Sequence, residues 1–238
     1  MEFFKCMQEK AEEFDLELNN DQLEKFNIYY NVLIEWNKKM NLTAITAPVD
    51  VAVKHMIDSL SVCDDEIIKT DSKIIDIGTG AGFPGIPLKI KYPHIKLTLL
   101  DSLNKRIKFL QNAVEAIGFT DIEFIHGRAE EIARQKKYRE KYDISLSRAV
   151  ARMPILCEYA LPFVKQGGFF AALKGKVYKE EIEEAKNALN VLGGKIYKVK
   201  SVSLPGIEDV RAIIYINKIN VTPALYPRKA GTPERNPL

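Results

Sequence analysis

With 238 residues, the chain is long enough for one large domain with a complete core, or for one domain and an appendage. Its 46% of hydrophobic and 28% of charged residues are ordinary globular values, and a net charge of +3 means that any nucleic-acid role requires local basic patches. No apolar run approaches a membrane span, and the acidic start does not resemble a signal peptide. Three cysteines without metal-ligand spacing are typical of a reducing compartment. We therefore expect a cytoplasmic protein.

The first part of the chain carries helical spacing. Between residues 2 and 38, hydrophobic side chains recur at intervals of three and four, which predicts two helices. Asn19-Asn20-Asp21 supplies the break between them and a cap for the second helix. A third helix is expected from about Val49 to Leu60. We expect residues 1–65 to form a helical extension packed on the main domain.

From residue 73 onward, strand-like and helix-like segments alternate. Strands are expected at 73–77, 96–100, 122–126, 142–146 and 168–173, and helices at about 84–91, 103–117, 129–137, 152–164 and 177–192. Two further strand-like runs, 195–203 and 210–216, have no helix between them and predict an antiparallel hairpin. The pattern predicts an α/β, Rossmann-like fold with a mostly parallel seven-stranded sheet that ends in this hairpin.

The boundaries of this main domain follow from the composition on either side. We expect residues 66–220 to form the Rossmann-like domain. Residues 221–238 are rich in proline and basic side chains, and are expected to form a tail without regular structure.

A glycine-rich turn follows the first strand of the alternating part. Gly80, Gly82 and Gly85 satisfy the G-x-G-x-x-G pattern of a dinucleotide site, which alone is a weak signal. A tight turn without a ligand is a weaker explanation, because so many glycines cost conformational entropy. Read from Asp76, the pattern is acid-x-G-x-G-x-G, with Gly78 as its first glycine. This resembles motif I of class I S-adenosylmethionine (SAM) methyltransferases, and we favour that interpretation.

Acids after the next two strands support a nucleoside site. Asp101 lies about twenty residues beyond the glycines, where an acid binds ribose hydroxyls in nucleotide-binding Rossmann folds. Alternatively, Asp101 caps the helix that opens at Leu103, and both roles are compatible. Ala129 and Glu130 follow the third strand, where such enzymes bind the adenine, and we expect them to contact it partly through the backbone.

Six segments in the same order resemble the bacterial small-subunit rRNA guanine-N7 methyltransferase family, RsmG, also called glucose-inhibited division protein B. They are Met40–Thr46, His55–Leu60, Asp76–Pro87, Ser147–Ala151, Leu173–Gly175 and Tyr226–Pro233. The resemblance covers nearly the whole chain. It implies methyl transfer from SAM to N7 of one guanine in the decoding-region loop of 16S rRNA. It also implies a SAM site lined by Gly78, Phe83, Ala129, Glu130 and Arg148.

The residue types agree with this chemistry. Guanine N7 carries an in-plane lone pair and no proton, so in-line attack on the sulfonium methyl needs alignment and exclusion of water but no general base. We find no Asn/Asp-Pro-Pro-aromatic motif after the fourth strand, which enzymes that methylate exocyclic amines use. Cys157 lacks the Pro-Cys context of C5-pyrimidine enzymes and is expected in the core. The target base must be unstacked to enter the site.

Arg148 is the side chain that we most expect to act in the reaction. It follows the fourth strand, at the carboxyl end where ligands bind in such sheets, and could contact the carboxylate of SAM or the guanine O6 and phosphate. The alternative is a surface ion pair with Asp143 or Glu158. His55 and Asp58 share one helix face, and either cap the substrate side of the pocket or dock the extension. No metal-ligand cluster is found.

Basic residues near the same edge are candidate phosphate contacts. They are Arg128, Arg148, Arg152, Lys174, Lys176, Arg228, Lys229 and Arg235. We expect a monomer that acts on 16S rRNA or on the small ribosomal subunit. The alternatives are a SAM-dependent methyltransferase for another acceptor, a SAM-responsive RNA-binding assembly factor and an NAD-dependent oxidoreductase.

Overall fold

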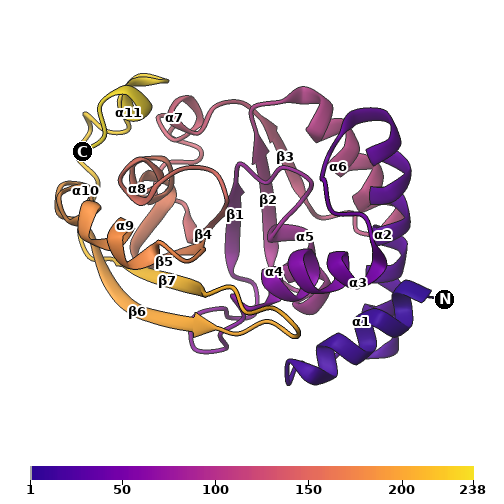
Figure 1. The fold of residues 1–238 in the computed structure, drawn as a ribbon. Coiled ribbons are helices and arrows are strands. Elements are labelled where there is room, and N and C mark those ends of the chain that lie inside the picture. Colours follow the sequence, from indigo (N-terminus) through magenta and orange to yellow (C-terminus); the bar gives the residue numbers. More distant parts are fainter. Residues whose placement is uncertain (1) are drawn as a thin grey trace.

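A seven-stranded sheet runs through the computed structural model, which describes residues 2–238 (Figure 1). Its strands are β1 (Lys73–Ile77), β2 (Lys96–Asp101), β3 (Glu123–His126), β4 (Tyr142–Arg148), β5 (Val164–Lys174), β6 (Gly194–Val202) and β7 (Arg211–Lys218). The spatial order is β3-β2-β1-β4-β5-β7-β6. The first five strands are parallel, and β7 is antiparallel to both β5 and β6. The predicted fold class is confirmed.

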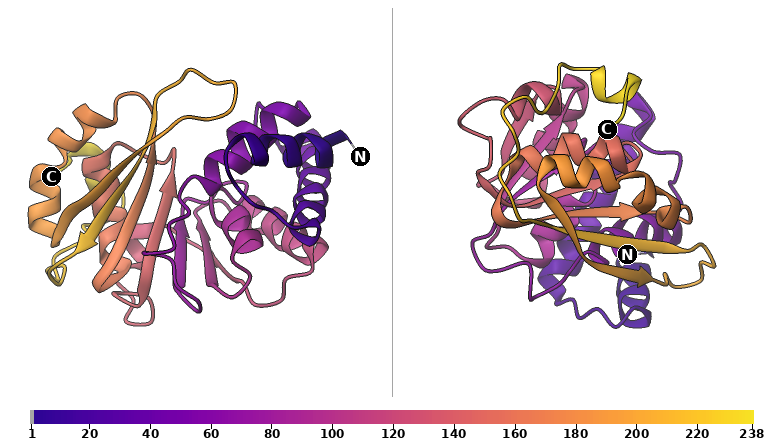
Figure 2. Two further views of the ribbon diagram at one scale, coloured as in Figure 1. Left: turned by 90° about the horizontal axis from the view of Figure 1, so that it is seen from below. Right: turned by 90° about the vertical axis from the view of Figure 1, so that its left-hand side faces the viewer.

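Two layers of hydrophobic side chains form because neighbouring residues of a strand point to opposite faces. Ile74 of β1 packs with the N-terminal helices, α5 (Gly85–Lys91) and α6 (Asn104–Ile117). Ile75 packs with α7 (Ala129–Ile132), α8 (Met153–Ala160) and α10 (Lys186–Leu192). Central strands are buried on both faces, as their mostly apolar sequences require. The loop between β6 and β7 extends beyond the sheet toward the N-terminal helices (Figure 2).

Helices cover both faces of the sheet (Figure 1). From β1 onward, strands and helices alternate up to the final hairpin, as predicted. The helices are α1 (Glu2–Glu13), α2 (Asn20–Met40), α3 (Pro48–Val51), η1 (Ala52–Ile57), α4 (Asp58–Leu60), α5 (Gly85–Lys91), α6 (Asn104–Ile117), α7 (Ala129–Ile132), α8 (Met153–Ala160), η2 (Leu161–Phe163), α9 (Tyr178–Glu184), α10 (Lys186–Leu192) and α11 (Thr232–Arg235). Within the described residues, no helix is both long and apolar enough to cross a membrane.

The N-terminal extension has no separate core. Phe26 and Leu33 of α2 belong to the same buried cluster as residues of the sheet, such as Leu97. Asn19 caps α2 as expected, in a reciprocal pair of hydrogen bonds with Gln22. The predicted third helix is continuous over α3, η1 and α4, and its middle section is a π-helix.

Several predicted boundaries were wrong. β5 begins at Val164, four residues earlier than expected. Its first half is polar and glycine-rich and pairs with β4 across a register shift, so it lacks the apolar alternation that predicts a strand. α7 ends at Ile132, because the following charged run has no apolar face to bury. The helix expected over 177–192 is divided into two at Ala185.

The C-terminal tail also differs from the expectation, because it contains the short helix α11. Pro233 stands in the first turn of this helix, where a missing backbone donor is tolerated. Pro233 is buried, and the tail packs against α8. The prediction failed because proline excludes a helix interior but not a helix start.

Candidate cofactor and substrate site

The three segments expected to bind the cofactor meet at the carboxyl edge of the sheet. The backbone N–H groups of Gly78 and Thr79 donate to the carbonyl of Leu100 at 2.9 and 3.1 Å. The N–H of Gly127 donates to the carbonyl of Asp101 at 3.1 Å. The glycine turn, the end of β2 and the end of β3 are therefore adjacent, which is the arrangement expected of a nucleoside site.

The glycines of the turn serve two different purposes. Gly78 and Gly80 are partly exposed, with φ of +66° and +62°, whereas Gly82 is buried with φ of +96°. A Cβ atom on Gly80 would meet nothing closer than 4.0 Å, but on Gly82 it would lie 2.6 Å from the Ile86 side chain and 2.7 Å from the Tyr29 hydroxyl. Gly82 is thus required by packing, and Gly80 leaves open space beside the backbone.

Asp76 holds the glycine turn from inside the protein. Its Oδ2 accepts hydrogen bonds from the Thr79 hydroxyl at 2.6 Å and from the Gly85 N–H at 2.9 Å. Its Oδ1 is buried and has no partner among the described residues. Burial raises the pKa of Asp76 to about 6, and these two hydrogen bonds oppose the rise. The carboxyl therefore organises the turn and retains one unused acceptor.

Asp101 joins the turn to the start of α6. Its carboxylate accepts from the N–H of Gly80 at 2.9 Å, from the N–H of Leu103 at 2.9 Å and from Arg106 at 3.3 Å. The helix starts at Asn104, one residue later than expected, and Leu103 is its N-cap residue. Asp101 is therefore not the N-cap, although it satisfies one donor close to the helix start.

Ala129 and Glu130 begin α7 beside the C-terminal tail. Ala129 is partly exposed, whereas Glu130 is buried. The Oε1 atom of Glu130 accepts a hydrogen bond from the N–H of Gly231 at 3.0 Å. The carboxylate is thus engaged by the tail, which leaves the backbone of this segment as the part free to contact an adenine.

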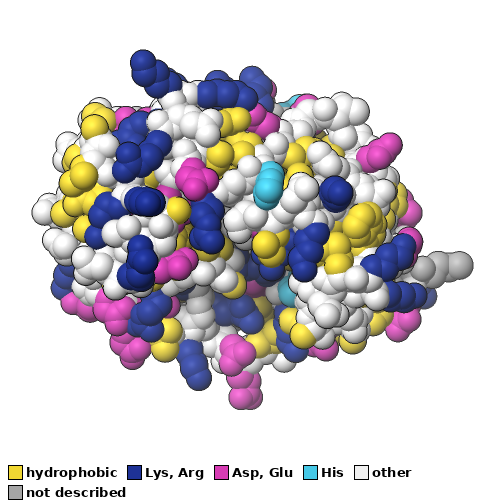
Figure 3. All heavy atoms as spheres, turned by 90° about the horizontal axis from the view of Figure 1, so that it is seen from above, with side chains coloured by type: hydrophobic (Ala, Val, Ile, Leu, Met, Phe, Trp, Pro, Cys, Tyr) yellow, Lys and Arg dark blue, Asp and Glu magenta, His cyan; other side chains and the backbone are white. Residues whose placement is uncertain are grey.

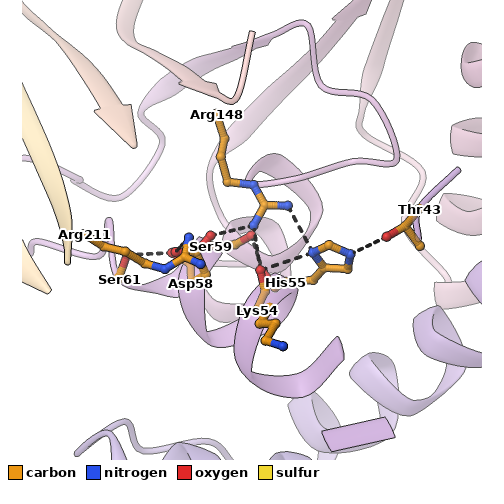
Figure 4. Close-up of polar contacts among 8 residues, drawn as sticks. All are labelled: Thr43, Lys54, His55, Asp58, Ser59, Ser61, Arg148 and Arg211. Carbon is orange, nitrogen blue, oxygen red and sulfur yellow. Dashed lines mark hydrogen bonds and ion pairs between the residues drawn. The ribbon is translucent and has the colours of Figure 1, made fainter. Parts of the chain in front are cut away.

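Arg148 points from the end of β4 to the N-terminal extension (Figure 4). Its Nη1 donates to Oδ2 of Asp58 at 2.7 Å and to the carbonyl of Lys54 at 3.1 Å. Its guanidinium carbon lies 4.9 Å from the centre of the buried Phe83 ring. Arg148 therefore joins the glycine segment, the extension and the sheet at one point.

The surface ion pairs considered for Arg148 are not formed. Asp143 pairs with Lys165 at 2.5 Å, and Glu158 pairs with Arg228 at 2.6 Å. The side chain of Arg148 is only 15% exposed. That alternative interpretation was wrong, because the partner of Arg148 comes from a distant part of the chain.

His55 and Asp58 both lie beside Arg148, but their other contacts differ. His55 stacks on Phe83 with ring centres 4.6 Å apart, and its Nε2 lies 2.8 Å from the Thr43 hydroxyl. Burial and the nearby Arg148 charge lower the pKa of His55 to about 4, so the ring is neutral near pH 7. Asp58 also pairs with Arg211, through Oδ1 at 3.3 Å. Both residues thus dock the extension, and Asp58 also faces a cavity.

That cavity lies at the ends of β4 and β5 and has a volume of about 370 Å³. Its lining comprises Asp58, Arg148, Ala149, Val150, Ala151, Arg152, Leu173, Lys174, Gly175, Glu181, Arg211, Ala212 and Ile213. Lys174 and Glu181 form an ion pair of 2.6 Å in which each side chain is 8% exposed. We name this space the acceptor cavity.

Sequence patterns did not reveal two residues of the acceptor cavity, Arg211 and Glu181. Arg211 opens β7, and the neighbouring Ala212 pairs with Lys174 at the end of β5. Because β7 is antiparallel, its first residues lie at the edge where the parallel strands end. This rule could have identified Arg211, whereas Glu181 lies on a helix face that carries no such signal.

The basic residues expected to contact RNA fall into three groups. Lys174 and Arg228 are mostly buried, and their charges are paired with Glu181 and Glu158. Arg152 is half exposed and paired with Glu184. The others are exposed: Arg128, Lys176, Lys229 and Arg235. In a view onto the carboxyl edge of the sheet, Lys and Arg side chains gather most densely over the half of the molecule that contains α8 to α11 (Figure 3).

Metal chemistry has no evident site here. Across residues 2–238, no group of three His, Cys, Asp or Glu side chains is placed to hold a metal ion. The open space beside Gly80, the carboxylate of Asp101 and the unused oxygen of Asp76 fit a nucleoside cofactor instead.

The strand order, the glycine turn over a buried acid and the acid that ends β2 together define a class I SAM-dependent methyltransferase. The fold is similar to that of the solved structure of M. jannaschii TYW2 in complex with AdoMet, with a TM-score of 0.51 and 17% identity. That match covers 64% of this chain and 72% of the other. It supports the fold alone.

The sequence comparisons identify the family within this class. The model of the family described as rRNA small subunit methyltransferase G (GidB) matches residues 22–210. The chain is 47% identical to ribosomal RNA small subunit methyltransferase G of Alkaliphilus metalliredigens, over the full length of both. It is 51% identical to the protein of that name from Thermoanaerobacter pseudethanolicus, over 97% of this chain and 96% of the relative. The chain belongs to the rRNA small subunit methyltransferase G family, as the sequence motifs predicted.

Proposed function

We propose that the protein transfers the methyl group of SAM to N7 of one guanine in the decoding-region loop of 16S rRNA. Family membership supports methyl transfer to small-subunit rRNA. The choice of guanine N7 rests on the resemblance and on the chemistry of the acceptor cavity. One observation carries it: both acids of the cavity are already paired with cations.

These pairings leave no side chain suited to remove a proton. Asp58 is held by two arginines and Glu181 by Lys174. The neutral ring of His55 is stacked and hydrogen-bonded. Methylation of an amine or a hydroxyl requires loss of a proton, whereas attack by the N7 lone pair does not. The arrangement therefore favours an acceptor that is nucleophilic without a base.

The protein contributes alignment and exclusion of water. SAM supplies the electrophilic sulfonium methyl. We assign the ribose hydroxyls to Asp101 and the adenine to the Ala129–Glu130 segment. The methionine part is assigned to the turn of Gly78, Gly80, Gly82 and Phe83, which Asp76 supports. Arg148 is assigned to positioning of SAM or of the substrate, since it contacts Phe83 and also lines the acceptor cavity.

We assign rRNA backbone contacts to the exposed cations of this edge, Arg128, Arg152, Lys176, Lys229 and Arg235. Arg152 lines the acceptor cavity, and Lys and Arg side chains gather over this half of the carboxyl edge (Figure 3), which supports electrostatic attraction of phosphates. Lys174 and Arg228 are assigned to the internal ion pairs instead. We further propose a cytoplasmic monomer that acts on 16S rRNA or on the small subunit.

The test is methyl transfer from labelled SAM to 16S rRNA that lacks the modification, offered as bare RNA and as small subunits. The labelled nucleotide is identified by mass and mapped by cleavage at N7-methylguanine. We expect one labelled guanine in the decoding-region loop. Label on another nucleotide, or no label while SAM still binds, would refute the assignment. Asp76→Ala serves as the inactive control.

A further inference from the structure

We propose that the acceptor cavity receives the guanine to be methylated, that Arg211 reads its O6 atom, and that Asp58 is the positioning residue for Arg211 and Arg148. The proposal rests on the proposed function. It adds a pocket, a base-reading side chain and the residue that holds this side chain in place.

The acceptor cavity adjoins the glycine turn. Val150 lines the cavity, and a Cβ atom built on Gly78 would lie 2.6 Å from Val150 Cγ2. Arg148 also lines the cavity, and its guanidinium lies against Phe83 of the glycine segment. The loop after β4 therefore borders both the cavity and the glycine segment.

Asp58 orients two arginines with one carboxylate. Its side chain is 6% exposed, and each of its oxygens pairs with a different arginine. Oδ2 lies 2.7 Å from Nη1 of Arg148, and Oδ1 lies 3.3 Å from Nη1 of Arg211. Asp58 directly follows the π-helix η1, and such helices occur frequently at functional sites. The cluster keeps one positive charge in excess, which suits an electron-rich ligand.

Arg211 retains a buried donor without an acceptor. Its Nε has no hydrogen-bond partner among the described residues, although its Nη1 is fixed by Asp58. Buried donors are rarely left unpaired, because the loss of water contacts costs free energy. Since Arg211 lines the acceptor cavity, a ligand there can supply the missing acceptor.

Guanine offers the matching acceptor. Its N7 edge presents N7 and O6, whereas adenine presents N7 and an amino group that is itself a donor. N7 must stay free to attack the methyl group, so O6 is the acceptor left for Arg211. A donor opposite the amino group of adenine would leave both groups unpaired, which disfavours adenine. The cavity lining, with four cationic and two acidic side chains, also suits the phosphate that accompanies the base.

Replacement of the target guanine by 2-aminopurine tests the contact, because this base keeps N7 but lacks O6. The 16S rRNA is assembled by ligation with guanine or 2-aminopurine at the target position and is reconstituted into small subunits. Methylation of both kinds of subunit is measured with the wild-type protein and with Arg211→Gln. For each protein, we take the ratio of kcat/KM with guanine to kcat/KM with 2-aminopurine. We expect this ratio to be larger for the wild type than for Arg211→Gln by about tenfold or more. Comparing ratios cancels the intrinsic reactivity of the two bases. An equal ratio in both proteins would overturn the assignment of Arg211.

Asp58→Asn tests the positioning role, with Asp64→Asn as the matched control. Asp64 forms an ion pair with Lys198 at 2.9 Å, and it does not line the acceptor cavity. We expect Asp58→Asn to keep SAM affinity, to lower kcat/KM and to lose the preference for guanine over 2-aminopurine, as Arg211→Gln does. Asp64→Asn should keep the preference. If Asp58→Asn retains the wild-type preference, Asp58 only docks the extension and its positioning role is refuted.

The outcomes separate this inference from the proposed function. If wild-type protein methylates no guanine, the proposed function fails. If it methylates guanine and Arg211→Gln preserves the base preference, only the inference fails. Since Arg211 is partly exposed, Arg211→Gln is expected to fold even if Asp58→Asn does not.

Discussion

Two neighbouring glycines should respond differently to the same substitution. Both Gly80 and Gly82 have positive φ, which costs an alanine about 1–2 kcal/mol. At Gly82 the new Cβ would also lie within 2.7 Å of the Ile86 and Tyr29 side chains. Overpacking of this kind adds about 1–3 kcal/mol. Gly82→Ala should therefore reduce the free energy of unfolding by about 2–5 kcal/mol, and Gly80→Ala by the smaller strain alone.

Thermal unfolding and SAM titration by calorimetry distinguish the two. For a chain of this size, we expect Tm to fall by roughly 4–20 °C in Gly82→Ala and by roughly 2–8 °C in Gly80→Ala. Gly80→Ala should nevertheless lose SAM affinity, because its methyl group occupies the open space beside the turn.

Gly118→Ala is the matched control. Gly118 has φ of +90°, ends α6 far along the chain from the turn, and a Cβ atom there would meet nothing within 4 Å. It should lose stability to the same extent as Gly80→Ala and keep wild-type SAM affinity. If Gly80→Ala binds SAM as well as Gly118→Ala does, the assignment of Gly80 to the cofactor site is wrong.

The other predictions concern single charged residues. Because the raised pKa of Asp76 favours its protonated form in the folded protein, stability from this group decreases as pH rises through about 6. In denaturant unfolding, Asp76→Asn should abolish a loss of about 1 kcal/mol between roughly pH 5 and pH 8, and an unchanged pH slope would contradict this. Asp76→Ala should abolish SAM binding in calorimetry. Arg148→Ala should lose methyl transfer while circular dichroism shows a retained fold, and wild-type turnover would exclude a role in the site. Arg228→Ala should lower the free energy of unfolding by about 3–5 kcal/mol, because Glu158, which is fully buried, loses its cation. The exposed Lys229→Ala should change stability by less than about 0.5 kcal/mol, and equal effects in these two variants would refute the distinction.

Local patterns were sufficient for the fold and for the meeting of the glycine turn with the ends of β2 and β3 at one edge of the sheet. The apolar run of β1, the glycines after it and the acid at the end of β2 lie close together in sequence and face one edge of the sheet. Their geometry follows from strand periodicity and from the positive φ that glycine permits. The absence of a helix between β6 and β7 likewise predicted the hairpin.

Long-range pairing of charges was not accessible in this way. Asp58 meets Arg148 and Arg211 only because the fold brings three distant segments together. In the tail, Arg228 and Lys229 look equivalent in sequence, yet one is paired inside the protein and the other is exposed. Charge pattern alone cannot tell a buried ion pair from a solvated cation, because the difference depends on tertiary packing.

Replacement of the target guanine by 7-deazaguanine tests the central claim most directly. This base keeps O6 and the amino group but carries C–H in place of N7. Small subunits that contain it at the mapped position are incubated with labelled SAM and the wild-type protein. The account predicts no methyl transfer to the substituted nucleotide, while subunits with guanine are fully labelled. Methylation of the 7-deazaguanine at the normal rate would show that the acceptor is another atom and would contradict the account.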